Sequence, residues 1–485
     1  MVVSKLESRP RRFAVIGAGG STGLETLKVA SEELRDHIRA GECELVGFEQ
    51  REDLGGVWLP DPNPSLSKQR WPDSPMYDFM TTNVPHPIMY YPFHLAPPST
   101  PLFTGVRVVN DYMQDYATRF GLRKYIRFNT LVTAATWDQS IKQWKVAYQT
   151  RGLSDCSTEV SYFDHLLVAN GHCRHPFMPE VPGLNVWALS GSRSHIHSIW
   201  YRNSGPYHGK RVLVVGGGRS GVDISDEVSK VAERTIHSSR SFGDQDFEHI
   251  IQRGAISHFS PDGYVYFRSG SKELVDRVVF ATGYQYDCDF LTQIPVQEPC
   301  LSSDHIYNSR SHIYPLAMHM FPLRATFPPS SLAFIGVPIA IPAFSMAEAQ
   351  ATLAVRQMSG RVSLDFNYEL SETLDRNEQL QRQHSHLALN TARAWHRFAP
   401  DAGWDYVDLV WEKALDSRRV PGWKRELLPQ GYVMRAEWQD LERLGLSKAW
   451  VDGVGEGGIE EWIKLMRRVV RRAQDRQHRT AAFSI

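Results

Sequence analysis

The sequence is poor in cysteine and has no excess of charge of either sign. Its five cysteines are scattered and form no C-x-x-C pair. This argues against a disulfide framework, a zinc site or a dithiol redox centre, and it fits a reducing compartment. Lysine plus arginine and aspartate plus glutamate number 54 each, so no overall field favours nucleic acid or a membrane surface. We therefore expect no nucleic-acid partner.

Long hydrophobic runs are also missing. The longest, residues 332–344, is interrupted by Pro338 and Pro342 and is too short to span a bilayer. The N-terminus is polar and basic and shows no signal-peptide pattern. We found no catalytic triad, no carboxylate pair and no metal-ligand cluster in the sequence. These absences predict a cytoplasmic protein with no transmembrane segment and no metal.

A complete G-x-G-x-x-G motif lies in the middle of the chain, at residues 216–221. It follows the apolar run 212–215, which is typical of a buried strand, and precedes a helical pattern. In this context Gly216 permits a tight turn, Gly218 lets backbone approach a pyrophosphate, and Gly221 lets the helix pack close to the strand. The motif predicts a dinucleotide site, the alternative being a glycine-rich turn without a ligand.

A second glycine motif follows the apolar run 13–16 near the N-terminus. Here the third glycine, Gly23, comes one residue late, so we expect a looser turn. Residues 43–48 read as the next strand, and Glu49 at its end can accept hydrogen bonds from an adenosine ribose. The interval between the motif and Glu49 exceeds the usual spacing of about 20 residues, and we attribute the excess to a longer first helix, about 24–39. The alternative for Glu49 is a solvated strand end.

The order of these and other motifs resembles that of the flavin-containing monooxygenase family of class B flavoproteins, over about residues 13–350. Gly55, Gly56, Val57 and Trp58 match the G-G-x-W of the family, and residues 82–85 match its T-N-x-P. Residues 197–202 match the H-S-x-x-Y-R of its interdomain linker, and residues 281–284 match its A-T-G-Y. Residues 332–336 with Glu348 and Gln350 resemble its return to the first domain.

The chain also departs from the family pattern. The family's identifying motif is blurred, since Leu189 stands for a phenylalanine and the spacing fits His195 better than His197. Arg219 occupies a slot that is usually small and polar, and Asn170 replaces a threonine. Trp200 lies near a position where Baeyer–Villiger relatives carry an aromatic residue, which keeps that class open. Beyond about residue 361 the resemblance fades.

The resemblance implies two doubly wound α/β domains. A discontinuous FAD domain would span residues 1–186 and 285–485, and an inserted NADPH domain would span 187–284, with the active site in the cleft between them. The family's cofactors are FAD and NADPH. In this chain the implied cofactor residues are Gly17, Gly19, Gly20, Ser21, Gly23, Glu49, Gly56, Trp58, Asn83, Gly216, Gly218, Arg219, Ser220, Gly221, Ser238, Ser239, Arg240, Thr282 and Gly283.

The resemblance also implies the chemistry. NADPH reduces the flavin, oxygen adds at flavin C4a, and the hydroperoxide oxygenates a small molecule, most simply at nitrogen or sulfur. Asn83 and Tyr201 are the implied catalytic residues, whereas a structural role is favoured for His197. Residues 235–240 end in two hydroxyls and an arginine with no acid, which suits a 2′-phosphate. The alternatives are Baeyer–Villiger oxygenation of a ketone and nucleotide binding without turnover.

The C-terminal third gives less information. Residues 373–398 and 404–415 have helical patterns. Residues 461–477 form a basic, amphipathic stretch that suits an interfacial membrane helix or a solvated or packed terminal helix, and we favour the solvated or packed helix. The sequence does not identify the substrate, and it leaves the oligomeric state open, a homodimer included.

Overall fold

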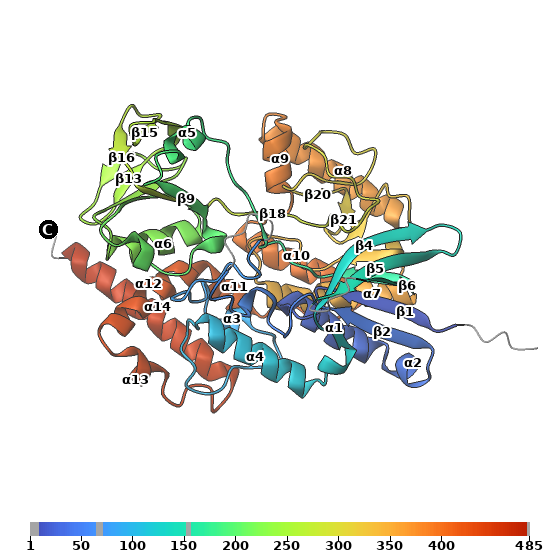
Figure 1. The fold of residues 1–485 in the computed structure, drawn as a ribbon. Coiled ribbons are helices and arrows are strands. Elements are labelled where there is room, and N and C mark those ends of the chain that lie inside the picture. The colour runs from blue at the N-terminus through green and yellow to red at the C-terminus, as the bar shows by residue number, and fades with distance from the viewer. Residues whose placement is uncertain (1–8, 65–70, 152–156, 483–485) are drawn as a thin grey trace, which may run out of the picture. The chain divides into compact units, whose positions relative to one another are not determined.

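The computed structural model describes residues 9–64, 71–151 and 157–482, so Cys156 lies outside the described residues. The chain forms two compact units (Figure 1). The first unit comprises residues 1–56, 82–171 and 288–485, and the second comprises residues 57–81 and 172–287. The second unit thus contains the whole segment 187–284 and adds residues 57–81 from the first half of the chain.

The first unit is built on a parallel sheet of order β23-β7-β1-β2-β3. Its central strand β1 carries Phe13, Ala14 and Val15, which are fully buried, as expected for a parallel strand covered on both faces. Its strands are β1 (Arg11–Ile16), β2 (Cys43–Phe48), β3 (Ile126–Arg127), β7 (His165–Val168) and β23 (Leu332–Phe334). Pairing of β23 with β7 confirms the predicted return of the chain to the first sheet.

Helices and a hairpin layer complete the N-terminal part of this unit. Helix α1 (Ser21–Glu33) packs against α7 (Ala343–Ser359) (Figure 1). A three-stranded antiparallel layer is formed by β4 (Thr130–Asp138), β5 (Gln143–Thr150) and β6 (Thr158–Phe163). The unit also contains the helix α4 (Val106–Arg119). Its shorter elements are α3 (His86–Met89), β19 (Tyr307–Asn308), β20 (Ile313–Tyr314), β21 (Leu316–Ala317) and β22 (Phe321–Pro322).

The single long helix predicted for residues 24–39 is wrong. The chain forms α1 and a separate α2 (Arg35–Arg39), with Leu34 between them in a non-helical conformation. Leu34 is buried, whereas α2 has no buried residue. The chain therefore turns where it buries Leu34, and the short exposed helix takes up the extra length before β2.

The second unit is built on a sheet of order β12-β13-β11-β10-β17-β9, parallel except at β12. On its central strand Leu213 faces one hydrophobic cluster, while Val212 and Val214 face another. Its strands are β9 (Ser194–His197), β10 (Arg211–Val215), β11 (Arg234–Ser238), β12 (Gln245–Asp246), β13 (Ile251–Arg253) and β17 (Arg277–Phe280). The two parallel sheets confirm the predicted α/β fold with one Rossmann-like domain inserted in another.

Smaller elements complete the second unit. Helix α6 (Arg219–Ser229) follows β10, and α5 (Leu184–Ala188) precedes β9. A three-stranded antiparallel sheet is formed by β14 (Ile256–Phe259), β15 (Tyr264–Phe267) and β16 (Lys272–Leu274), and β8 (His175–Pro176) pairs with β18 (Tyr284–Gln285).

The C-terminal third of the chain is helical and belongs to the first unit. The helix predicted for residues 373–398 is two helices, separated where Ser385 and His386 adopt positive φ. The helices are α8 (Phe366–Gln383), α9 (Ala388–Trp395), α10 (Pro400–Lys413), α11 (Gly422–Leu427), α12 (Gly431–Arg443), α13 (Ser447–Val451) and α14 (Ile459–Ala482).

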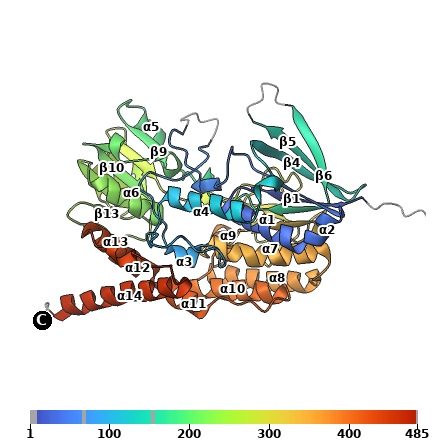
Figure 2. The ribbon, with the colours of Figure 1, turned by 90° about the horizontal axis from the view of Figure 1, so that it is seen from below.

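The last helix, α14, is packed against the protein. Trp462, Met466 and Val469 on its apolar face are fully buried, and α14 lies along α12 (Figure 2). Its arginines form ion pairs with acids of α11 and α12: Arg467 with Glu426, and Arg472 and Arg476 with Glu437 and Asp440. The prediction of a packed terminal helix is therefore confirmed, because the apolar face that would have to enter a membrane is already buried against the protein.

Candidate cofactor sites

The second glycine turn, residues 216–218, connects β10 to α6. Gly216 has φ +132°, and a Cβ there would lie 2.1 Å from the Ala281 carbonyl oxygen. A Cβ on Gly221 would lie 1.9 Å from the Gly216 carbonyl oxygen. At Gly218, which caps the helix, a Cβ would meet no protein atom within 4 Å. Two glycines therefore close the turn, and the third leaves room for a ligand at the helix N-terminus.

The first glycine turn, residues 17–20, connects β1 to α1 and is one residue longer. Gly17 has φ +83°, and its Cβ would lie 2.7 Å from the Ala169 carbonyl oxygen. A Cβ on Gly23 would lie 2.1 Å from the Gly17 carbonyl oxygen. Gly23 is the third residue of α1, as Gly221 is of α6. Counted from the helix start the two motifs coincide, so the late third glycine reflects one extra residue before the helix. Ser21 and Ser220 lie in the first turns of these helices.

The two glycines of the G-G-x-W motif pack on the first glycine turn. The Gly55 N–H donates to the Gly19 carbonyl over 2.9 Å. A Cβ on Gly56 would lie 2.8 Å from the Gly20 Cα. The protein backbone itself therefore demands glycine at position 56. Trp58 ends a short 3-10 helix and is half-buried.

Glu49 is the first residue after β2 and is buried at 4% exposure. Its Oε2 accepts from the Gly19 N–H and its Oε1 accepts from the Arg51 N–H, each over 2.9 Å. Burial raises the pKa of Glu49 more than these hydrogen bonds lower it. Glu49 therefore supports the first glycine turn directly, with acceptor positions left on both oxygens.

Ser239 occupies the equivalent place in the second unit, as the first residue after β11. A Cβ on Gly217 would lie 2.6 Å from the Ser239 Oγ, and a Cβ on Gly19 would lie 2.7 Å from the Glu49 Oε2. Each glycine turn thus faces the residue that follows the next strand along the chain, β2 in the first unit and β11 in the second. That residue is an acid in the first unit and a hydroxyl in the second.

The neighbours of Ser239 differ in accessibility. Arg240 is exposed and forms no hydrogen bond or ion pair with the described residues. Ser238 is buried, and its hydroxyl donates to the Gly254 carbonyl over 2.6 Å, so it serves the interior of the unit. Arg219 lies 3.3 Å from Asp223 one helical turn along. Of these cations, Arg240 is the one presented to solvent.

Asn83 is exposed, while the backbone around it is held in place. Thr82 exchanges hydrogen bonds with Thr104, its N–H donating to the Thr104 carbonyl over 2.9 Å. The Arg435 guanidinium from α12 donates to the Thr82 carbonyl over 2.7 Å. The C-terminal helices, which the sequence left unassigned, therefore support the segment that presents Asn83.

The linker residues 197–202 are anchored inside the second unit. The Ile199 N–H donates to Nδ1 of His197, and Nε2 of His197 lies 3.1 Å from the Gly283 carbonyl, which requires the neutral ring with the proton on Nε2. Burial lowers the pKa of His197 to about 4. His197 thus has the structural role that the sequence favoured.

Arg202 and Tyr201 hold residues 57–81 to this unit. Arg202 is buried and donates to four carbonyls, those of Asp61, Ser74, Ile199 and Tyr201. Tyr201, 1% exposed, packs among the rings of Tyr77, Phe79 and Tyr207. The sequence did not predict this attachment, because Arg202 and the carbonyls of Asp61 and Ser74 are far apart along the chain.

The A-T-G-Y segment, residues 281–284, contacts the second glycine turn and forms hydrogen bonds with Phe177. The Thr282 hydroxyl donates to the Phe177 carbonyl, and the Gly283 carbonyl accepts from the Phe177 N–H over 2.9 Å. In the first unit, Ala169 and Asn170 lie against Gly17 as Ala281 lies against Gly216. Replacement of threonine by Asn170 therefore leaves the backbone contact with the glycine turn in place.

Other kinds of site find no support in the described part of the chain. It holds no group of three or more histidine, cysteine, aspartate or glutamate side chains placed for a metal. Its four cysteines, Cys43, Cys173, Cys288 and Cys300, are free thiols. None of its helices is long and apolar enough to cross a bilayer.

Comparison with known proteins agrees with this geometry. The family model described as flavin-binding monooxygenase-like matches residues 10–254. Flavin-containing monooxygenase FMO GS-OX-like 9 of Arabidopsis thaliana is 31% identical over 398 residues, covering 76% of this chain and 80% of that protein. FMO GS-OX4 of the same plant is 28% identical over 461 residues, covering 89% and 92%.

Solved structures share the fold. S-allyl-L-cysteine S-oxygenase from Allium sativum has a TM-score of 0.73 at 24% identity and covers 96% of this chain and 99% of its own. A cyclohexanone monooxygenase with bound ε-caprolactone has a TM-score of 0.55 at 13% identity, covering 84% and 98%. The chain therefore belongs to the flavin-binding monooxygenase-like family and is an FAD-dependent monooxygenase that uses NADPH.

Proposed function

We propose that this protein catalyses the NADPH- and oxygen-dependent oxygenation of a small organic molecule at nitrogen or sulfur, through a flavin C4a-hydroperoxide. The S-oxygenase named above shares the fold over nearly the whole chain, which supports sulfur as the acceptor atom. FAD supplies the oxygen chemistry, while the residues of this chain bind, orient and exclude water.

The observation that carries the proposal is the pair of equivalent glycine turns with different residues facing them. The first turn suits FAD, because the Glu49 carboxylate can accept hydrogen bonds from ribose hydroxyls. The second turn suits NADPH, because Ser239 and the exposed Arg240 can bind a 2′-phosphate, which a carboxylate would repel. Open space at Gly218 leaves room for a pyrophosphate at the start of α6.

Asn83 is the residue that we assign to the oxygenation step. Its side-chain amide offers two donors and an acceptor without a titrating charge, and it is exposed on a backbone fixed by Thr104 and Arg435. We assign it a hydrogen bond that orients the reacting oxygen. Tyr201 is left out of this step, because its hydroxyl is buried inside the second unit.

Baeyer–Villiger oxygenation of a ketone is the second candidate. Trp200 in the linker and the shared fold of the cyclohexanone monooxygenase motivate it. Both reactions add one oxygen atom, so product mass does not separate them. The site of insertion does, because a thioether gives a sulfoxide whereas a ketone gives an ester.

The test is anaerobic reduction of the holoenzyme with NADPH, followed by mixing with oxygenated buffer and recording of absorbance. We expect the yellow flavin to bleach and a transient near-ultraviolet band to form before oxidised flavin returns. A thioether and a ketone of similar size are then compared for the rate at which this band decays. Direct reoxidation without the band, with and without either compound, would contradict the proposed chemistry.

A further inference from the structure

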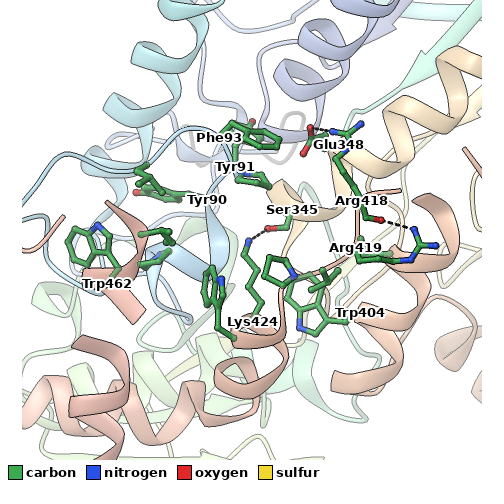
Figure 3. Close-up of a pocket in the computed structure, with 18 of the residues that line it drawn as sticks. Tyr90, Tyr91, Phe93, Ser345, Glu348, Trp404, Arg418, Arg419, Lys424 and Trp462 are labelled. Carbon is green, nitrogen blue, oxygen red and sulfur yellow. Dashed lines mark hydrogen bonds and ion pairs between the residues drawn. The ribbon is translucent and has the colours of Figure 1, made fainter. Parts of the chain in front are cut away.

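A cavity of about 470 Å³ lies in the first unit among α3, α7, α10, α11 and α14 (Figure 3). This volume is in the range of small-molecule sites. None of the predicted cofactor residues lines it. Its walls are aromatic, including Tyr90, Tyr91, Trp404, Trp411, Trp423 and Trp462. Flat ring systems would therefore find large apolar faces to stack on.

Lys424 of α11 lines this cavity and is buried at 4% exposure. Its Nζ donates to the Ser345 Oγ over 2.8 Å and to the Ile88 carbonyl over 3.2 Å. Both acceptors are neutral, and within the described chain no carboxylate lies in ion-pair distance of this amine. Burial lowers the pKa of Lys424 to about 7. In its charged form this buried ammonium has no counter-ion in ion-pair distance, which is costly, and the third of its N–H donors has no acceptor among the described residues.

Glu348, the acid that lines the cavity, does not serve as the counter-ion of Lys424. Its carboxylate is bound by Arg418 over 2.6 Å and lies 3.8 Å from Lys28. The guanidinium of Arg418 also lies over the Trp411 ring, 3.8 Å from the ring centroid. Arg418 is also bound by Asp416, and Arg419 lies 4.0 Å from Glu412. Among the described lining residues, Lys424 is therefore the Lys or Arg side chain with no carboxylate in ion-pair distance. A cationic guest is therefore disfavoured in spite of the aromatic walls, and an anion is favoured.

We propose that this cavity is a binding site for a small organic anion, a flat apolar ring system bearing a carboxylate that accepts a hydrogen bond from Lys424. The carboxylate supplies the counter-ion that the buried amine lacks, and the rings stack on the tryptophan and tyrosine faces. The site is built from elements of the first unit alone. It does not depend on the oxygenation proposed above, because occupancy is measured without turnover.

The test is isothermal titration of the FAD-loaded protein with 2-naphthoate and with its neutral counterpart 2-naphthamide. We expect the carboxylate to bind about tenfold tighter or more, the usual size of a charged hydrogen bond. Lys424→Met should abolish this preference and leave the amide affinity nearly unchanged. Lys464→Met, at an exposed lysine of α14, is the matched control and should keep the preference.

Val420→Trp places a large ring at the cavity wall and should weaken both ligands together, which locates binding without touching Lys424. Equal affinities of the two ligands for the unmodified protein would overturn the proposal, whether or not Lys424→Met folds. So would a preference that survives in Lys424→Met, or the absence of binding by either ligand.

Discussion

The two glycine turns differ in length and in the residue that faces them, yet their first and last glycines make equivalent contacts. In both, the first glycine lies against the strand that returns to the sheet, and the third residue of the helix is a glycine under a carbonyl oxygen. The first turn takes an extra residue and faces buried Glu49, whereas the second faces Ser239. The start of the helix therefore keeps the register of the motif in both turns. We expect the residue that follows the next strand, Glu49 after β2 and Ser239 after β11, to set which dinucleotide fits.

The turns also differ in their cover. The helix-capping glycines are both open, since a Cβ on Gly20 would meet only the Gly17 carbonyl oxygen at 3.7 Å and a Cβ on Gly218 would meet nothing within 4 Å. The first turn differs in having a second backbone segment against it, because Gly55 donates to the Gly19 carbonyl and Gly56 lies against Gly20. We therefore expect FAD to purify with the protein and NADPH to bind reversibly.

The largest effects are expected from Gly23→Ala and Gly221→Ala. Each adds a Cβ about 2 Å from a backbone carbonyl, which displaces the helix start. Gly23→Ala should yield protein without FAD, whereas Gly221→Ala should stay yellow and be reduced by NADPH roughly a hundredfold more slowly. Flavin content and stopped-flow reduction measure this. Gly422→Ala, where a Cβ has open space, is the control, and equal flavin loss in both turn variants would contradict the assignment.

Asn83→Ala tests the chemistry apart from the two turns. Removal of one donor at a reacting oxygen commonly costs about 10²-fold or more in rate. We expect product formation to fall by this order, with hydrogen peroxide formed in its place, while flavin content and the Michaelis constant for NADPH stay unchanged. Unchanged coupling of NADPH use to product would remove Asn83 from the reaction.

Ser239→Glu transfers the acid of the first turn to the second. A carboxylate beside a 2′-phosphate is repulsive, so the Michaelis constant for NADPH should rise by about 10–100-fold. The constant for NADH should stay the same or fall. Steady-state kinetics with both nucleotides measure this. Ser238→Glu cannot serve as the same test, because Ser238 is buried. Equal losses with both nucleotides would mean that Ser239 does not face the 2′ position.

Arg240→Ala is expected to have a smaller effect of the same kind. Loss of a charge-assisted hydrogen bond should raise the Michaelis constant for NADPH by about tenfold and leave that for NADH little changed. The same kinetics measure it, with Arg234→Ala at the opposite, exposed end of β11 as the control. If the Michaelis constant for NADH rises as much as that for NADPH, Arg240 does not bind the 2′-phosphate.

Gly218→Ala should have the smallest effect. Its backbone, at φ −80°, suits alanine, and the protein leaves space for a methyl group there. Folding should therefore be unaffected, and any rise in the Michaelis constants should be equal for NADPH and NADH, because both carry the pyrophosphate. Unaltered constants for both would place the pyrophosphate away from this glycine.

Strands and glycine turns could be predicted because their signals are local. Runs such as residues 212–215 are apolar throughout when both faces of a parallel strand are buried, and the structure places strands there. The helix breaks at Leu34 and after Gln383 were not predicted. Helical periodicity continues through them, and the turns depend on what tertiary packing buries.

Contacts between residues that lie far apart in the sequence could not be predicted, for a related reason. The bonds from Arg202 to Asp61 and Ser74, and from Arg435 to Thr82, join residues that only the folded chain brings together. The cavity around Lys424 is likewise assembled from separate segments, α3 and α7 together with α10, α11 and α14 of the region where the family resemblance fades. In sequence, Lys424 is one charge beside a tryptophan and gives no sign of burial.

The most direct test of the account is a crystal structure of the protein with FAD and NADP⁺ bound. We expect the FAD pyrophosphate at the first turn with its ribose on Glu49, and the NADP⁺ 2′-phosphate on Ser239 and Arg240. FAD at the second turn, or a 2′-phosphate that contacts neither Ser239 nor Arg240, would contradict it.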